Sequence, residues 1–192
     1  MLTKYQLKKA ESNLMYFYNL ASESDFKNGV TWYKEAHIFC VNLANEYNTT
    51  FEIVANVLSA LSPRNKWEQN KKDTIKVFKA INKGQNENDI KVCTFSKNKR
   101  KAFKIAKKEL LITENSPKTY SFVQNIAFLN DNFVTIDVWH YRASFNKMRI
   151  KKALTKLEYY QLEKLTINLA KKTGLKGYEF QAVVWCAIRN NY

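Results

Sequence analysis

Glycine and proline are scarce in this chain, and that scarcity constrains its fold more than any other feature. The 192 residues include only four glycines and two prolines. A sheet-rich protein needs a turn roughly every 8–12 residues, and turns draw heavily on these two residue types. Apolar residues instead recur at helical spacing along most of the chain. The sequence therefore predicts an all-α fold of about eight to ten helices, arranged as a two-lobed helical bundle.

Capping residues and breaks in the apolar pattern set the limits of the predicted helices. Thr31, a Thr49–Glu52 capping box, Ser62 before Pro63, Asp137 and a Thr155–Glu158 capping box mark helix starts. We expect helices over residues 3–20, 31–47, 51–61, 64–81, 96–112, 117–128, from 138, 155–173 and 178–190. The helix over 51–61 has no polar face and should lie in the middle of the core. The polar residues 83–95 are the candidate mobile loop.

The composition is that of one globular domain spanning residues 1–192, with no clear linker. Hydrophobic residues make up 45% of the chain and aromatic residues 14%, which suits a packed interior. No apolar run approaches the roughly 20 residues of a membrane-spanning helix. The N-terminus is amphipathic, unlike a signal peptide. We therefore expect no membrane partner and a cytoplasmic location, while protein partners remain unknown.

The cysteines and histidines do not form a metal-binding pattern. Cys40, Cys93 and Cys186 are far apart, and His37 and His140 are the only histidines. No spacing among them matches a zinc site or an iron–sulfur cluster. The sequence predicts buried, reduced thiols and neither a metal nor another cofactor, with a carboxylate-assisted metal site as the open alternative.

Positive charge is in large excess. Thirty-two Lys and Arg residues against seventeen Asp and Glu residues give a formal net charge of +15. Such an excess points to a polyanionic partner, although a solvated basic surface that keeps the chain soluble is the alternative. Two clusters are the candidate phosphate-binding groups: Arg64, Lys66 and Lys71 in one, and Lys97, Lys99, Arg100, Lys101 and Lys104 in the other. We expect both to face one groove that binds DNA, either duplex or single-stranded.

Four segments, in order, carry a resemblance to a known superfamily. They are an apolar helix with a polar continuation (51–73), the run KNKRKAFKI (97–105), Lys118-Thr119 at the start of a helix, and IDVWHYR (136–142). This order is similar to that of the helix-hairpin-helix DNA glycosylases of the endonuclease III type. The resemblance implies the glycosylase fold and cleavage of the N-glycosidic bond of a damaged or modified nucleobase.

The resemblance assigns candidate catalytic roles to Asp137 and Lys118. A carboxylate beside the anomeric carbon would stabilise a cation-like sugar and orient the nucleophile. Lys118 would attack the sugar and form a Schiff base, giving AP-lyase chemistry, in those members that use a lysine. From the residues alone, a plain helix N-cap at Asp137 and a solvated lysine at position 118 are the alternatives. We expect the two side chains to share one cleft.

Enzymes of this fold extrude the target base, so residues that stack on it or hydrogen-bond to it are needed. The candidate substrate-binding residues are Trp67, Trp139, Asn65, Asn70, His140 and Arg142. For His140, a hydrogen bond within its own helix is the alternative. Trp32 and Trp185 are predicted to be core residues.

The chain departs from the glycosylases in several places. The hairpin is normally LPGVGxK, whereas ITENSPK (112–118) contains neither glycine, and Trp139 stands where the family usually has His. The patterns ALSPxxxWxxN and VTIDxW are also similar to a group of phage-encoded proteins, which implies no function but would place the chain in the host cytoplasm. Three alternatives therefore stay open: a catalytically inactive nucleic-acid-binding protein of the same fold, a phage enzyme of DNA base hypermodification, and an inhibitor that binds a host protein.

Overall fold

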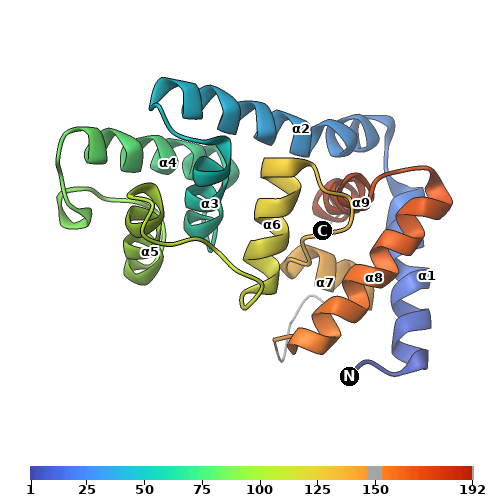
Figure 1. Cartoon of the computed structure of the whole chain (residues 1–192). Coiled ribbons are helices and arrows are strands. Elements are labelled where there is room, and N and C mark those ends of the chain that lie inside the picture. The colour runs from blue at the N-terminus through green and yellow to red at the C-terminus, as the bar shows by residue number, and fades with distance from the viewer. Residues whose placement is uncertain (147–152, 192) are drawn as a thin grey trace. The chain divides into compact units, whose positions relative to one another are not determined.

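A computed structural model describes residues 1–146 and 153–191 of the chain (Figure 1). The described residues form nine α-helices and one short 3-10 helix, and they contain no strand. The predicted all-α fold is confirmed. The chain divides into two compact units, which we call unit 1 (Met1–Glu35 with Leu129–Tyr192) and unit 2 (Ala36–Phe128).

Unit 1 combines the two ends of the chain. It contains α1 (Lys4–Leu20), the first half of α2 (Glu23–Glu46), α7 (Val138–Phe145), α8 (Lys156–Thr173) and α9 (Gly177–Asn191). One buried cluster joins α1 to α9 through Leu14, Phe17 and Phe180. A second cluster packs Val134 and Ile136 against α8. The residues that precede α7 are therefore part of the core of this unit.

Unit 2 is built around a central apolar helix. It contains the rest of α2, then α3 (Phe51–Leu61), α4 (Trp67–Asn82), the 3-10 helix η1 (Glu87–Asp89), α5 (Ser96–Ala106) and α6 (Pro117–Phe128). Every residue of α3 from Ile53 to Leu61 is buried. Helices α4, α5 and α6 each pack against α3, as Figure 1 shows. The central position predicted for this helix is confirmed.

Helix α2 begins earlier than the sequence predicts. The expected start at Thr31 is wrong, because Ser22 and Asp25 form a reciprocal cap in the SESDFKNG stretch. The Ser22 hydroxyl accepts from the Asp25 N–H at 3.1 Å, and the Asp25 carboxylate accepts from the Ser22 N–H at 3.0 Å. Gly29 lies inside α2 at the contact with α9, where a Cβ would come within 2.6 Å of the Val183 backbone. This glycine allows α2 to approach α9 closely.

Three other helix limits also differ from the prediction. Helix α3 is capped by Thr50 rather than Thr49, and the Thr50 hydroxyl accepts from the Ile53 N–H at 3.2 Å. Helix α4 begins at Trp67, because Arg64 adopts a left-handed conformation (φ 59°) that separates it from α3. Helix α5 ends at Ala106, since Lys108 is also left-handed (φ 64°).

The described helices include none that is both long enough and apolar enough to cross a membrane. The expectation of buried cysteines is wrong at one position, because Cys93 is exposed whereas Cys40 and Cys186 are buried. Burial raises the pKa of the Cys40 thiol to about 12. That thiol is therefore protonated at neutral pH and packs as an apolar group.

Candidate functional site

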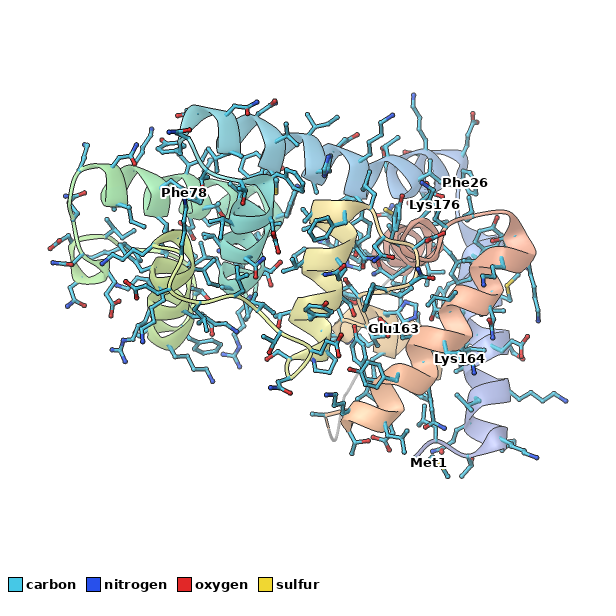
Figure 2. The ribbon with its side chains drawn as sticks, viewed as in Figure 1. Met1, Phe26, Phe78, Glu163, Lys164 and Lys176 are labelled. Atoms are coloured by element: carbon cyan, nitrogen blue, oxygen red, sulfur yellow. The ribbon has the colours of Figure 1, made fainter. Side chains whose placement is uncertain are left out.

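Asp137 is held at the start of α7 by the extended residues before it. The Tyr159 hydroxyl donates to the Val134 carbonyl at 2.8 Å and accepts from the Ile136 N–H at 3.1 Å. The Glu163 carboxylate accepts from the Val134 N–H at 2.9 Å. Figure 2 labels Glu163, which is buried, beside its exposed neighbour Lys164 on α8. Side chains of α8 thus satisfy a short extended run that has no sheet partner, and they fix where Asp137 lies.

The Asp137 side chain is the N-cap of α7. Its Oδ1 accepts from the His140 N–H at 2.8 Å, and the residue is half-buried. The positive end of the helix dipole favours an ionised carboxylate at this position. Tyr33 is buried nearby: burial raises the pKa of its hydroxyl first, and the charge of Asp137 raises it further. Asp137 is therefore a fixed carboxylate beside a neutral phenol.

His140 is a structural residue, and the substrate contact predicted for it is wrong. Its side chain is completely buried, and its Nε2 lies 2.9 Å from the Thr166 hydroxyl on α8. Burial lowers the pKa of the imidazole to about 3, so the ring is neutral at physiological pH. A side chain enclosed in this way joins α7 to α8 and cannot reach a base in DNA. The alternative considered from the sequence, a hydrogen bond of the side chain within its own helix, also differs from what is observed, because Thr166 belongs to α8.

Trp139 and Arg142 lie together on α7. The Arg142 guanidinium carbon is 4.5 Å from the centre of the Trp139 ring, and the Arg189 guanidinium from α9 is 5.9 Å from the same ring. Both Trp139 and Arg142 are half-buried. The Arg142 Nε is buried and has no hydrogen-bond partner among the described residues. Two guanidinium groups thus hold the Trp139 ring in place. Trp139 itself lies in the first turn of the helix that Asp137 caps.

The two basic clusters lie in unit 2, on helices that pack against each other. The loop before α4 (62–66) and the loop before α5 (91–95) are joined by a hydrogen bond from the Thr94 hydroxyl to the Pro63 carbonyl, at 3.1 Å. Asp73 is fully buried and accepts from Asn65 at 3.0 Å, Gln69 at 2.8 Å and the Cys93 N–H at 2.8 Å. One buried carboxylate therefore holds both loops, and the starts of α4 and α5 come close together.

Neither of these two helix starts is capped by its own N-cap side chain. Lys66 precedes α4 and Phe95 precedes α5, and neither side chain forms a capping hydrogen bond. By contrast, side chains cap α1, α3, α7 and α8. The start of a helix carries the positive end of its dipole, which favours an anion where no acidic N-cap is present.

The predicted phosphate-binding residues differ in their exposure and in the contacts that they already make. Lys66, Lys97 and Lys104 are exposed. Arg64 lies over the Phe95 ring at 5.2 Å, and its side chain therefore reaches the start of α5. Partial burial lowers the pKa of the Lys101 amine. The others have partners in unit 2: Lys71 with Glu68 at 2.9 Å, Arg100 with Glu87 at 2.9 Å, and Lys99 with the Ile90 carbonyl at 3.1 Å.

The substrate-binding residues predicted at the start of α4 have different environments. Trp67 is the first residue of α4, is half-buried, and has the Lys71 amine 5.6 Å from its ring centre. Asn65 is half-buried and donates to Asp73. Asn70 is buried and donates to the Leu58 carbonyl at 3.0 Å, so a base contact there is wrong. Its amide ties α4 to α3.

Lys118 is exposed in the first turn of α6, directly after Pro117. The ITENSPK segment before it forms a turn in which the Ser116 N–H donates to the Thr113 carbonyl at 3.0 Å. Lys118 belongs to unit 2 and Asp137 to unit 1. The predicted cleft shared by the two residues stays a prediction.

The sequence interpretation missed one hollow in unit 1. A pocket of about 410 Å³ is formed by α2 and α9, and Trp32 and Trp185 line it. Both tryptophans are half-buried, so their predicted core positions are wrong. The sequence does carry a signal for this pocket, because each tryptophan has a charged residue on the same face of its helix. Glu35 lies three residues after Trp32, and Arg189 lies four residues after Trp185.

Comparison with known proteins gives one match. The model of a family of unknown function, DUF7178, matches residues 1–192, and the chain belongs to this family. No curated protein and no solved structure matches the chain.

Proposed function

We propose that this member of the DUF7178 family is a DNA-binding base-excision enzyme of the helix-hairpin-helix glycosylase type. Unit 2 would bind the phosphate backbone, and Asp137 of unit 1 would support cleavage of the N-glycosidic bond. The proposal joins the resemblance of four ordered segments to the local geometry of both units. The location of both basic clusters on the packed helices α4 and α5 is the observation that carries it.

The surface at the starts of α4 and α5 has the chemistry of a phosphate-binding site. Exposed Lys66 and Lys97 flank two helix starts that lack side-chain caps. Arg64 reaches from one start to the other across Phe95. Backbone N–H groups and flexible cations together suit phosphate oxygens and do not select a base sequence. Binding through this surface is therefore expected to depend on salt more than on DNA sequence.

Asp137 has the features that a catalytic carboxylate requires. It is fixed by the core residues that precede it and by its capping bond to the His140 N–H. Cleavage of a nucleoside leaves positive charge on the sugar, which a preorganised carboxylate stabilises. The same group could orient a water molecule toward the anomeric carbon and take up its proton.

The position of Lys118 favours base release by water over Schiff-base chemistry. A nucleophilic lysine needs a site that holds its amine against the sugar, commonly an enclosed one. Lys118 is exposed in the first turn of α6. Borohydride trapping on abasic or modified DNA tests this point. We expect no covalent complex, and a complex that disappears in Lys118→Ala would instead make the lysine the nucleophile.

A salt titration of DNA binding tests the phosphate-binding surface. Roughly five phosphate contacts give a log–log slope near −4 to −5. Replacing Lys66, Lys97 and Lys104 by Ala should reduce that slope by about 3, one for each lost contact. Replacing the exposed Lys4, Lys8 and Lys9 of α1 is the matched control and should change it little. Equal effects of the two triple variants would show that net charge, not this surface, drives binding.

A DNA-binding protein without catalysis is the second candidate, and the capping bond of Asp137 is the observation that favours it. In that case the carboxylate serves the helix alone. A third outcome, remodelling of a phage base, would appear as a new nucleoside by mass spectrometry rather than as a released base. Incubation with modified phage DNA separates these outcomes from base excision.

A further inference from the structure

The pocket of unit 1 has a composition that the proposed glycosidic chemistry does not use. Helix α2 contributes Asn28, Thr31, Trp32 and Glu35, which recur at helical spacing along one face, and α9 contributes Trp185 and Arg189. The two faces meet because Gly29 allows α2 to approach Val183 on α9. The pocket therefore results from packing between segments about 150 residues apart in the sequence.

The tryptophans give the pocket two aromatic surfaces. Their ring centres are 6.3 Å apart and their planes are tilted by 52°, so the rings are not stacked on each other. Arg189 lies over the Trp185 ring at 4.3 Å. The same guanidinium approaches Trp139, on which Arg142 is stacked. A series of aromatic rings and guanidinium groups thus connects the pocket to the helix that Asp137 caps.

The polar groups of the pocket fall into two kinds. Asp25 is buried, and its oxygens accept from Ser22 and Asn190, so it holds the pocket wall together. Burial and the charge of Asp25 raise the pKa of the Cys186 thiol to about 11, which leaves it neutral. Glu35 and Arg189 are exposed, and neither forms a salt bridge in the described part of the chain. An acceptor and a donor are thus available beside two aromatic rings.

We propose that this pocket binds a guanine base against the Trp32 ring, with the Glu35 carboxylate and the Arg189 guanidinium reading its edges. A flat heterocycle stacks on tryptophan whatever its sequence context. Guanine presents adjacent N–H donors that a carboxylate accepts, together with O6 and N7 acceptors that a guanidinium contacts. The other DNA bases lack that combination. The volume of about 410 Å³ is within the range of small-molecule sites.

The base can come from a free nucleotide or from an unpaired strand, and calorimetric titration distinguishes the two sources. Guanosine monophosphate is titrated against adenosine and cytidine monophosphates, and a guanine-containing single strand against its adenine counterpart. Preference for guanine in both forms assigns a nucleotide site. Preference in the strand alone assigns a subsite for DNA. No preference in either form overturns the proposal.

Substitution of Glu35 identifies the site. Glu35→Gln should lower guanine affinity about tenfold and leave adenine affinity unchanged, as expected for loss of one specific edge contact. Glu23→Gln, also exposed on α2 but outside the pocket lining, is the matched control. Because Glu35 is exposed, both variants should fold. Unchanged guanine preference in Glu35→Gln would refute this assignment, whatever the fate of salt-dependent duplex binding by unit 2 or of base release by Asp137.

Discussion

The start of α7 in unit 1 differs from the starts of α4 and α5 in unit 2 in whether the N-cap side chain accepts a hydrogen bond from the first N–H groups of the helix. Helix α7 has an anionic N-cap, because the Asp137 carboxylate accepts a hydrogen bond from the His140 N–H. Helices α4 and α5 follow Lys66 and Phe95, whose side chains provide no cap. A fixed carboxylate suits chemistry at a developing cation, whereas uncapped N–H groups among lysines suit a phosphate. The proposed function gives the two units separate roles on the basis of this difference.

The largest expected effect concerns the anion of α7. Asp137→Asn should lower the rate of base release at least about a hundredfold, the magnitude typical of removing an acid–base or preorganised electrostatic group. The amide oxygen can still cap the helix, so thermal unfolding and DNA binding should change little. Single-turnover assays on modified DNA measure the rate.

Thr155→Ala is the control for that experiment. It removes the side-chain cap of α8 in the same unit, where the Thr155 hydroxyl accepts from the Glu158 N–H. It should destabilise the protein by about 1 kcal/mol and leave the rate of base release unchanged. If Asp137→Asn, like Thr155→Ala, leaves the rate of base release unchanged, Asp137 is only a helix cap. The catalytic role proposed for it would then be wrong.

The second effect concerns the buried imidazole that supports α7. The pKa of His140 is about 3 in the folded protein and about 6.5 in an unfolded chain, so between these values only the unfolded chain binds the proton. Stability from this group is therefore complete above pH 6.5 and is lost as the pH falls. The free energy of unfolding should drop by about 2 kcal/mol between pH 7 and pH 5.

Urea denaturation at the two pH values measures this loss. His140→Gln should remove it, because an amide can still bond to Thr166 but does not titrate. His37→Gln in unit 2 is the control and should retain it. A wild-type stability that is equal at pH 7 and pH 5 would contradict the burial of a neutral His140.

The smallest effect tests the uncapped start of α4. Lys66→Ala and Lys66→Ser remove the same charge, but serine also caps the helix and should make the protein about 1 kcal/mol more stable than the alanine variant. If the first N–H groups of α4 contact phosphate, the serine variant should also bind DNA more weakly than the alanine variant. Equal affinities, measured at the same salt concentration, would show that only the lysine charge matters.

Local patterns in the sequence predicted the parts of the fold that depend on local physics. Few glycines and prolines, with apolar residues at helical spacing, sufficed for the all-α fold. The apolar composition of residues 51–61 predicted a helix inside a core, and α3 is buried there. Asp137 and Thr155 were recognised as caps because a cap acts on N–H groups only two or three residues away.

Packing between distant segments decided the rest. His140 and Asn70 looked available for DNA, but Thr166 and Leu58 from other helices hold them inside the core. Asp73 is buried between two loops and binds them together.

The pocket shows the same limit most clearly. Trp32 and Trp185 were predicted to be core, yet they line a pocket where α2 meets α9. No local pattern specifies such a meeting, because it depends on which faces of helices about 150 residues apart pack together. The sequence by itself determined where helices form. Only the tertiary structure decided which side chains those helices bury and which they present to a ligand.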